Sequence, residues 1–267
     1  MRRVLRIGHK GADALVPGNT VESFVAAVEV GVDAIELDVL RPQDDFADGS
    51  DWRRAAGGPA TASGPLLVAH DWADARRREP LTLEQALDAF TEPPLDEVRF
   101  DLDLKIAGRE DEIVAALRER DLLGRAMTSG MEVASVRYLR DAAPELARGW
   151  TVPRVSRDWS RNRLLRPVYL AGSASLRARL PGIVRRVAPR LDVGSIWVFH
   201  RLITPRLVAA AHGVEVAVIA WTVDDGDRIG ALAQLGVDGI VTNDPRLLAG
   251  YGRAATPGTR LTPRDSK

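Results

Sequence analysis

Short apolar runs alternate along this chain with longer segments in which apolar residues recur every three or four positions. The runs are rich in Val, Ile and Leu, as is typical of strands buried on both faces, and the intervening segments have the period of amphipathic helices. This alternation predicts an α/β fold built from βα units around a parallel sheet. Strands are predicted near residues 4–8, 34–39, 99–105, 125–129, 147–152, 194–199, 215–221 and 238–242, with helices that include 20–30, 111–120, 132–141 and 204–212.

Eight predicted strands suit a closed barrel. Residues 66–70 form a ninth apolar run, but residues 42–65 before it are rich in Gly, Pro, Ser, Asp and Arg and show no helical pattern. Parallel pairing would require a long crossover connection, so we expect 66–70 to be a hairpin strand outside the barrel.

Local signals set the helix ends and the domain limits. Thr20 and the run Thr82-Leu83-Glu84-Gln85 are predicted to cap helix starts, and Gly31, Gly213 and Gly236 to end helices. Four prolines interrupt the arginine-rich residues 153–192, for which we expect an irregular insertion. Residues 1–251 are predicted to form one domain, and the polar residues 252–267 a disordered tail.

Composition limits the chemistry available. The 267 residues contain 37 Lys plus Arg and 37 Asp plus Glu, so no net charge attracts nucleic acid or acidic membranes, and an anionic small-molecule substrate must be captured locally. The absence of cysteine excludes disulfides, thiolate nucleophiles and cysteine-bound metals. The N-terminus shows no signal peptide and the chain no long apolar span, from which we expect a cytoplasmic location.

A pair of acidic residues occupies one predicted buried strand. Glu36 and Asp38 share one face of an extended chain, so both carboxylates can reach one cation, and oxygen ligands favour magnesium or calcium. Their neighbours in 34–39 are apolar, and unpaired carboxylates are costly there. The alternative is that Glu36 and Asp38 form structural salt bridges with Lys10 and Lys105.

The third predicted strand also has a polar face. Alternation places Asp101, Asp103 and Lys105 on one side and apolar residues on the other. Near the C-terminal end of a barrel strand, this face can supply a third carboxylate and a lysine that contacts phosphate. An edge strand with one solvent-exposed face would give the same pattern.

Two histidines follow apolar runs. His9 ends the first predicted strand, within His9-Lys10-Gly11, and His70 ends the run at 66–70. Beside a metal-bound substrate, such histidines can exchange protons, and Lys10 can contact phosphate. The alternatives are an incidental histidine in a turn at position 9 and a surface histidine at position 70.

Two late strand ends are candidate walls of the site. They are Trp221-Thr222-Val223 and the run from Gly239 to Pro245. Trp221 is a candidate substrate contact, although a tryptophan at a strand end more often packs. We expect His200 to begin a loop.

Several motifs occur in a fixed order: His9-Lys10-Gly11, Gly18-Asn19-Thr20, Glu36-x-Asp38, His70-Asp71, Pro80-Leu81-Thr82-Leu83-Glu84, Asp103-x-Lys105, Trp221-Thr222-Val223 and Gly239-Ile240-Val241-Thr242-Asn243-Asp244-Pro245. Their order and spacing resemble the glycerophosphodiester phosphodiesterase family over most of residues 4–248. The resemblance implies a TIM-type (β/α)8 barrel, here with the hairpin strand after the second barrel strand. It also implies hydrolysis of glycerophosphodiesters to sn-glycerol 3-phosphate and an alcohol, with a divalent cation.

The same resemblance assigns roles to individual residues. The acid/base histidines would be His9 and His70, and the metal ligands Glu36, Asp38 and Asp103. The candidate substrate contacts Lys10, Lys105 and Trp221 come from their places at the predicted strand ends. We take His9 as the base and His70 as the acid, and the cation as Mg²⁺ or Ca²⁺. The chain departs from the family pattern at Lys10, where arginine is usual, and at Gly18 and Asp103, where glutamate is usual.

Two further interpretations remain open. An Asp-x-Lys motif is also similar to the related sphingomyelinase D type phospholipases, so a lysophospholipid or sphingolipid substrate is an alternative. Arginines within 176–186 would then contact headgroups, unless they only form a solvated helix face. The departures could instead mark a barrel that binds phosphate esters without cleaving them.

Overall fold

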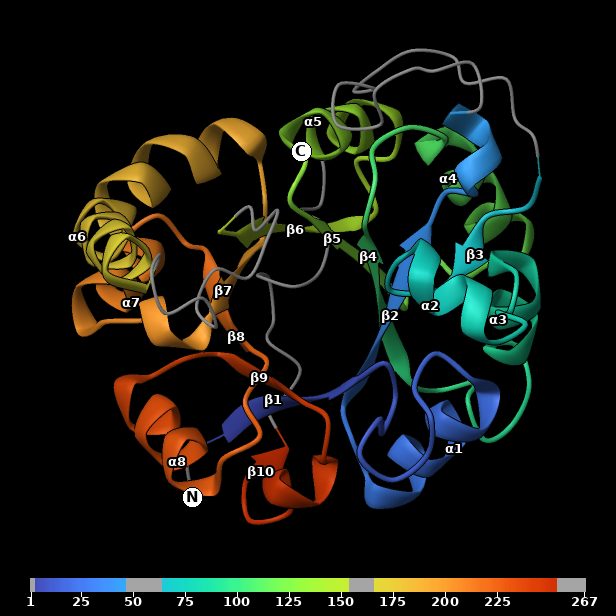
Figure 1. Ribbon diagram of the computed structural model, residues 1–267, viewed down its shortest axis with the longest axis horizontal. Helices are drawn as coiled ribbons and strands as arrows, with labels where there is room; N and C mark the ends of the chain where they lie inside the picture. Colours follow the sequence, from blue (N-terminus) through green and yellow to red (C-terminus); the bar gives the residue numbers. More distant parts are fainter. Residues whose placement is uncertain (1–2, 47–63, 154–165, 254–267) are drawn as a thin grey trace.

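The computed structural model describes residues 3–46, 64–153 and 166–253, and its centre is a closed ring of parallel strands (Figure 1). The eight strands follow one another around the ring in chain order, and β1 pairs with both β9 and β2, which closes it. They are β1 (Arg3–His9), β2 (Ala34–Leu40), β4 (Arg99–Leu104), β5 (Ala126–Gly130), β6 (Ala147–Val152), β7 (Ser195–Phe199), β8 (Ala217–Trp221) and β9 (Gly239–Thr242). The predicted eight-stranded barrel is therefore confirmed.

Two short strands lie outside this ring. β3 (Leu67–Val68) pairs antiparallel with the end of β2, as predicted for residues 66–70. β10 (Gly252–Arg253) runs parallel to the start of β1. The 3-10 helix η1 (Gln43–Phe46) follows β2, whereas residues 47–63 lie outside the described residues. Of the predicted tail 252–267, the first two residues form β10 and residues 254–267 lie outside the described part.

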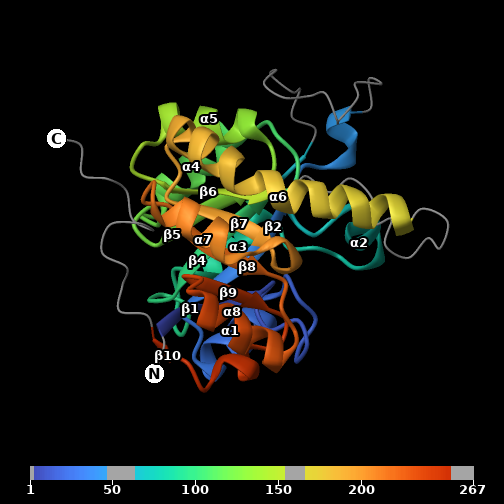
Figure 2. The ribbon, with the colours of Figure 1, turned by 90° about the vertical axis from the view of Figure 1, so that its left-hand side faces the viewer.

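Helices cover the outside of the ring (Figures 1 and 2). They are α1 (Val21–Val30), α2 (Trp72–Arg77), α3 (Leu83–Ala89), α4 (Glu110–Glu119), α5 (Val133–Ala142), α6 (Arg166–Leu191), α7 (Pro205–His212) and α8 (Gly226–Leu235), with the 3-10 helices η2 (His200–Leu202) and η3 (Pro245–Leu248). The predicted caps are present: Thr20 accepts from the Ser23 amide, and Thr82 with Gln85 forms a capping box. No helix in the described part of the chain has the length and apolar character needed to cross a bilayer.

The predicted irregular insertion is wrong for residues 166–191, which form the single helix α6 of 26 residues. Its buried residues Leu180, Val184, Ala188 and Leu191 recur at helical spacing and pack against the barrel. An interior proline costs roughly 3 kcal/mol, but each buried aliphatic side chain returns about 1.5–3 kcal/mol. Packing therefore outweighs the helix-breaking tendency of the prolines, to which the prediction gave too much weight. Residues 154–165 lie outside the described part.

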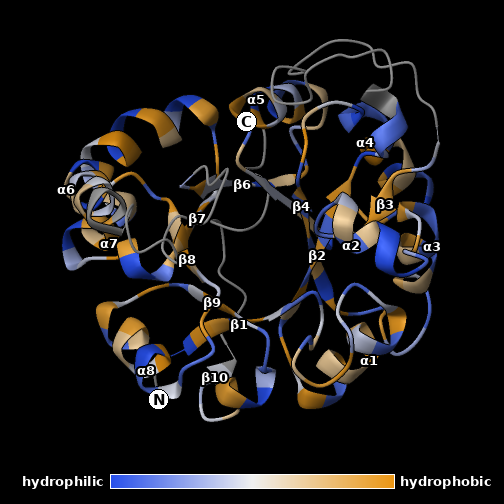
Figure 3. Cartoon of the chain, in the orientation of Figure 1, coloured by the Kyte–Doolittle hydropathy of each residue, from blue (hydrophilic) through white to orange (hydrophobic). Residues whose placement is uncertain are grey.

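The inside of the barrel changes from apolar to polar along its axis. Inward-facing apolar side chains fill the half near the strand N-termini, and hydrophobic and hydrophilic residues alternate along the surrounding helices (Figure 3). The interior apolar cluster consists of Leu5, Ile7, Ala34, Met127, Ala147, Trp197, Ala217, Ile219 and Val241. The polar side chains gather at the strand C-termini, where a barrel has its open end.

Candidate active site

Three carboxylates meet at the C-terminal ends of two neighbouring strands. Glu36 and Asp38 lie on β2, and Asp103 lies on β4 directly opposite Asp38 in the sheet register. One oxygen from each carboxylate lies within 4.8 Å of one oxygen from each of the others, and all three residues are buried. β4 lies between β2 and β5, so its polar face points into the barrel, and the alternative of a solvent-exposed edge strand is wrong.

Lys105 provides positive charge inside this group. Its Nζ lies 2.5 Å from Asp38 Oδ1 and also forms an ion pair with Asp103. Burial alone would lower the pKa of Lys105, but Asp103, Asp38 and Glu36 raise it well above its usual value, so the ammonium stays charged. Of the salt bridges considered from the sequence, the one between Asp38 and Lys105 therefore forms, whereas the Lys10 amine pairs with Asp13 and Glu36 accepts from the Lys10 backbone amide.

The carboxylates still carry more negative charge than Lys105 balances. Burial, and then repulsion from Asp38, raises the pKa of Glu36 well above its usual value. Burial would also raise the pKa of Asp38, but Lys105, His70 and His9 outweigh it and keep that pKa low. Asp103 Oδ1 is buried and has no hydrogen-bond partner among the described residues. This set of crowded oxygen donors fits a hard divalent cation such as Mg²⁺ or Ca²⁺.

His9 is held in one tautomer by a residue from the far end of the chain. Its Nδ1 lies 2.5 Å from Oδ1 of Asn243, just after β9, and the Asn243 amide nitrogen donates to Asp224 at 2.6 Å, which fixes the orientation of the amide. Because Oδ1 only accepts, Nδ1 carries the hydrogen, and Nε2, 3.8 Å from Glu36 Oε2, keeps a free lone pair. Burial lowers the pKa of His9 against the opposing effects of Asp38 and Asn243, so this ring is neutral near pH 7.

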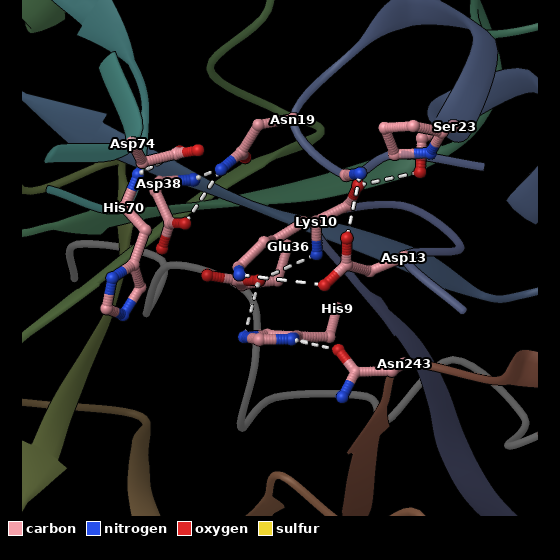
Figure 4. Close-up of polar contacts among 12 residues, drawn as sticks. His9, Lys10, Asp13, Asn19, Ser23, Glu36, Asp38, His70, Asp74 and Asn243 are labelled. Atoms are coloured by element: carbon pink, nitrogen blue, oxygen red, sulfur yellow. Dashed lines mark hydrogen bonds and ion pairs between the residues drawn. The ribbon is translucent and has the colours of Figure 1, made fainter. Parts of the chain in front are cut away.

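His70 approaches the same carboxylates from outside the ring. It follows β3, its side chain is 53% exposed, and its Nδ1 lies 3.2 Å from Asp71 Oδ2. Asp74 accepts a hydrogen bond from the His70 backbone amide and so fixes the start of α2 beside the site. Figure 4 shows His70 beside Asp38 and His9 beside Glu36, with both rings bordering one group of carboxylates.

Lys10 contributes through both its backbone and its side chain. Its amide donates to Glu36 Oε2 at 3.0 Å, and its amine lies 3.6 Å from Asp13 Oδ2. The Gly18 amide donates to the other oxygen of Asp13 at 2.8 Å, and a Cβ at Gly18 would lie only 2.5 Å from that oxygen. The carboxylate of Asp13 thus occupies the space that a side chain at position 18 would enter.

Sequence reasoning missed two asparagines that orient the site. The buried Asn19 side chain donates to Asp38 Oδ2 at 2.8 Å and accepts from the Asp38 amide at 3.1 Å, while Asn243 orients His9. Asn19 has a left-handed backbone, with φ 59°, which asparagine tolerates better than most residues. That tolerance, within Gly18-Asn19-Thr20, was the available signal.

Trp221 ends β8, a strand neighbouring the one that precedes Asn243. Its ring centroid lies 5.7 Å from that of Phe199, and its Nε1 is buried without a hydrogen-bond partner in the described part of the protein. His200 begins η2 and packs edge-on against Phe199 at 5.0 Å, and its Nδ1 accepts from Arg228 Nε. Trp221 therefore stands at the open end of the barrel, and His200 lies in the connection after β7.

Comparisons with known proteins decide the family. The model of the glycerophosphoryl diester phosphodiesterase family matches residues 9–46 and 77–247, which is most of the chain. The chain belongs to this family. The matched ranges include His9, Glu36, Asp38 and Asp103 but not His70. The predicted membership and the enzyme class, a phosphoric diester hydrolase, are confirmed.

Other members share its length and its fold. A glycerophosphodiester phosphodiesterase of Caldanaerobacter subterraneus is 27% identical over 92% of this chain and 96% of its own length. A putative glycerophosphoryl diester phosphodiesterase of Silicibacter pomeroyi has the same fold, with a TM-score of 0.66 and 22% identity over 95% of this chain and 97% of that one. An Oleispira antarctica phosphodiesterase, solved in complex with the product sn-glycerol-3-phosphate, matches with a TM-score of 0.60 and 19% identity over 91% and 94% of the two chains.

Proposed function

We propose that this protein hydrolyses glycerophosphodiesters to sn-glycerol 3-phosphate and an alcohol. The observation that carries the proposal is the meeting of Glu36, Asp38 and Asp103 beside two histidines at the open end of the barrel. Membership of the family and the product held by the Oleispira antarctica protein support this substrate class.

Glu36, Asp38 and Asp103 would hold a divalent cation, Mg²⁺ or Ca²⁺. Two observations support this assignment: Asp103 Oδ1 has no hydrogen-bond partner among the described residues, and burial beside Asp38 raises the pKa of Glu36, a strain that a bound cation would relieve. When bound, the cation supplies positive charge that stabilises the phosphate oxygens as charge develops on them.

His9 acts as the general base in this mechanism. Its burial and its hydrogen bond to Asn243 leave Nε2 unprotonated and directed toward the carboxylates. Nε2 takes the proton of the attacking oxygen, which belongs to water or to the 2-hydroxyl of the substrate glycerol. In the second case a cyclic phosphate forms first, and water then opens it.

His70 acts as the general acid. Its position at the exposed edge of the site allows it to reach the departing alcohol, to which it gives a proton as the bond between phosphorus and the alcohol oxygen breaks. Lys10 and Lys105 bring positive charge toward the phosphate, and Trp221 forms one wall for the substrate. A cytoplasmic location remains a prediction from the sequence.

The test is a product assay with metal control. After treatment with EDTA the protein should release no glycerol 3-phosphate from glycerophosphocholine, and Mg²⁺ or Ca²⁺ should restore release, because the carboxylates would need a cation to act on the phosphate. Asp103→Asn should abolish this restoration, whereas Asp111→Asn, the same charge change on the exposed surface of α4, should behave like the wild type.

Two results would contradict the proposal. One is full activity after complete metal removal. The other is the absence of product from a panel of glycerophosphodiesters with either metal, which would favour a barrel that only binds phosphate esters.

A further inference from the structure

α6 carries an unbalanced charge within a chain that is neutral overall. Its 26 residues include six arginines and no aspartate or glutamate, although the whole chain has 37 residues of each charge type. A helix that only needed solubility would ordinarily carry both signs, with pairs three or four residues apart. The excess of arginine points to an anionic partner.

Five arginines of α6 and α7 have no acidic partner among the described residues. Some exposed arginines elsewhere are paired: Arg118 forms an ion pair with Glu145, and Arg246 forms one with Asp244. By contrast, within residues 3–46, 64–153 and 166–253 no acidic side chain pairs with the following five arginines. They are Arg177, Arg179, Arg185 and Arg186 of α6 and Arg206 of α7, all of them exposed.

Most of these arginines surround a groove between α6 and α7. The groove has a volume of about 990 Å³, and Arg179, Arg185, Arg186 and Arg206 line it together with small and apolar residues such as Ala178, Gly182 and Ala209. Its described lining includes no acidic residue. Guanidinium groups bind phosphate oxygens in a bidentate manner, so this lining favours phosphate groups over simple halide ions.

The first half of α6 extends beyond the barrel. Residues 170–179 include no buried residue, and the buried positions begin at Leu180. The chain enters α6 after the C-terminal end of β6, so this half projects on the side of the barrel where the carboxylates lie. Figure 2 shows α6 reaching past the neighbouring helices.

The projecting half also exposes an apolar side chain. Leu170 is 55% exposed, more than any other large aliphatic residue of the described surface. Arginines beside an exposed leucine suit the boundary between lipid headgroups and acyl chains, where the charges meet phosphates and the leucine leaves water. Nucleic acid would satisfy the charges but leave Leu170 in water.

We propose that α6 and the adjoining face of α7 dock this protein on the surface of anionic phospholipid bilayers. The arginines contact headgroup phosphates and Leu170 enters the acyl boundary, which brings the open end of the barrel near the membrane. This proposal is independent of which diester the active site cleaves.

The test is flotation of the full-length protein with vesicles of phosphatidylcholine, with and without phosphatidylglycerol, in the absence of substrate. We expect the protein to float only with vesicles that contain phosphatidylglycerol, and we expect this binding to weaken at high salt. Replacing Arg177, Arg179, Arg185 and Arg186 by glutamine should weaken partitioning roughly fivefold per arginine. The control variant replaces Arg3, Arg118, Arg137 and Arg246 by glutamine, so its net charge changes by the same amount. This control should bind the vesicles like the wild type. Leu170→Gln should also weaken binding.

Three outcomes would overturn the docking proposal. The first is that the protein does not float with vesicles that contain phosphatidylglycerol. The second is that both quadruple variants lose vesicle binding equally. The third is that the same arginines bind duplex DNA more tightly than anionic vesicles. Hydrolysis of glycerophosphocholine in solution should be unchanged in the α6 variant. A negative result in the flotation test therefore does not contradict the proposed activity, and a negative result in the activity assay does not contradict docking.

Discussion

At the scale of single residues, the two histidines differ in how firmly they are held. The His9 side chain is only 19% exposed and is bound to Asn243, which Asp224 orients in turn, whereas His70 is exposed and bound to its neighbour Asp71. A buried neutral imidazole with one nitrogen engaged suits proton abstraction at a fixed point. An exposed imidazole suits proton donation to alcohols of different sizes.

We therefore expect His9→Ala and His70→Ala each to lower turnover by about a hundredfold or more, the usual contribution of an acid or base. Steady-state kinetics with glycerophosphocholine measures this, and circular dichroism checks the fold. His212→Gln, remote in α7, should keep its turnover. Unchanged turnover in either alanine variant would remove that histidine from the mechanism.

Gly18 is required because Asp13 fills the space beside it. A Cβ there would lie 2.5 Å from Asp13 Oδ1 and 2.7 Å from the Lys10 Cβ, so Gly18→Ala should displace Asp13 and loosen the Lys10 amine. We expect KM to rise several-fold and kcat to fall less, because phosphate capture is affected more than proton transfer.

Two further variants make this expectation specific. Asp13→Ala with Gly18→Ala should cost less than the sum of the two single changes, since both act on the contact with Asp13 and only the close approach to the Lys10 Cβ remains. Gly172→Ala, on α6 where an added Cβ meets nothing within 4 Å, serves as the control. Additive effects of the two changes would contradict this coupling.

At the scale of elements, the strands were predictable and α6 was not. Strands such as β7 and β8 are short apolar runs, because both of their faces are buried, and β4 shows a clear alternation of polar and apolar residues; both signals are local. In α6 the apolar period is interrupted by Pro181 and Pro189, and only packing against the barrel decides the outcome. The hairpin strand β3 was predictable because the missing crossover left no other way to pair.

The connection after β7 contains a group that should make stability sensitive to acid. Burial, then the charges of Arg228 and Arg201, lowers the pKa of His200 from 6.5 to about 4. The folded protein thus binds this proton more weakly than the unfolded chain, so the stabilising contribution is complete above about pH 6.5 and is lost as pH falls toward about 4. Since the ring is partly exposed, we expect a loss of about 1–2 kcal/mol.

Urea unfolding of the wild type and of His200→Gln at several pH values measures this contribution. The free energy of unfolding of the wild type should fall more steeply between neutral pH and about pH 4 than that of the variant. Parallel curves for the two proteins would show that protonation of His200 has no effect on stability.

At the scale of the whole molecule, one tryptophan fills the centre of the barrel. Trp197 of β7 lies in the interior apolar cluster, and its ring occupies the space beside Gly149 of β6, where a Cβ would lie 2.6 Å from Cδ1. Gly149→Ala should therefore overpack the interior and lower the free energy of unfolding by about 1–3 kcal/mol. Urea denaturation measures the change.

Gly124→Ala is the matched control, because nothing lies within 4 Å of an added Cβ there. It should alter stability by less than about 1 kcal/mol. Equal stability of the wild type and Gly149→Ala would mean that Trp197 can shift without loss.

The three carboxylates Glu36, Asp38 and Asp103 could be identified from the sequence, because the alternation along each strand shows which face a residue occupies. That alternation is a local property of the sequence. The sequence could not identify the partner of His9, since Asn243 lies 234 positions away and is brought near only by pairing of β1 with β9. Nor could it choose between Lys10 and Lys105 as the partner of Asp38, a choice that depends on the register of β2 with β4.

Closure of the ring between its first and last strands also governs when the site can exist. During synthesis, the segment that contains Asn243 emerges from the ribosome after the segments that carry the three carboxylates and both histidines. Until then His9 has no amide to orient it, so a nascent or truncated chain would carry the carboxylates without an organised base. Catalytic competence should therefore appear only after residue 243 has been made and β9 has paired with β1, and termination before that residue would leave an inactive fragment.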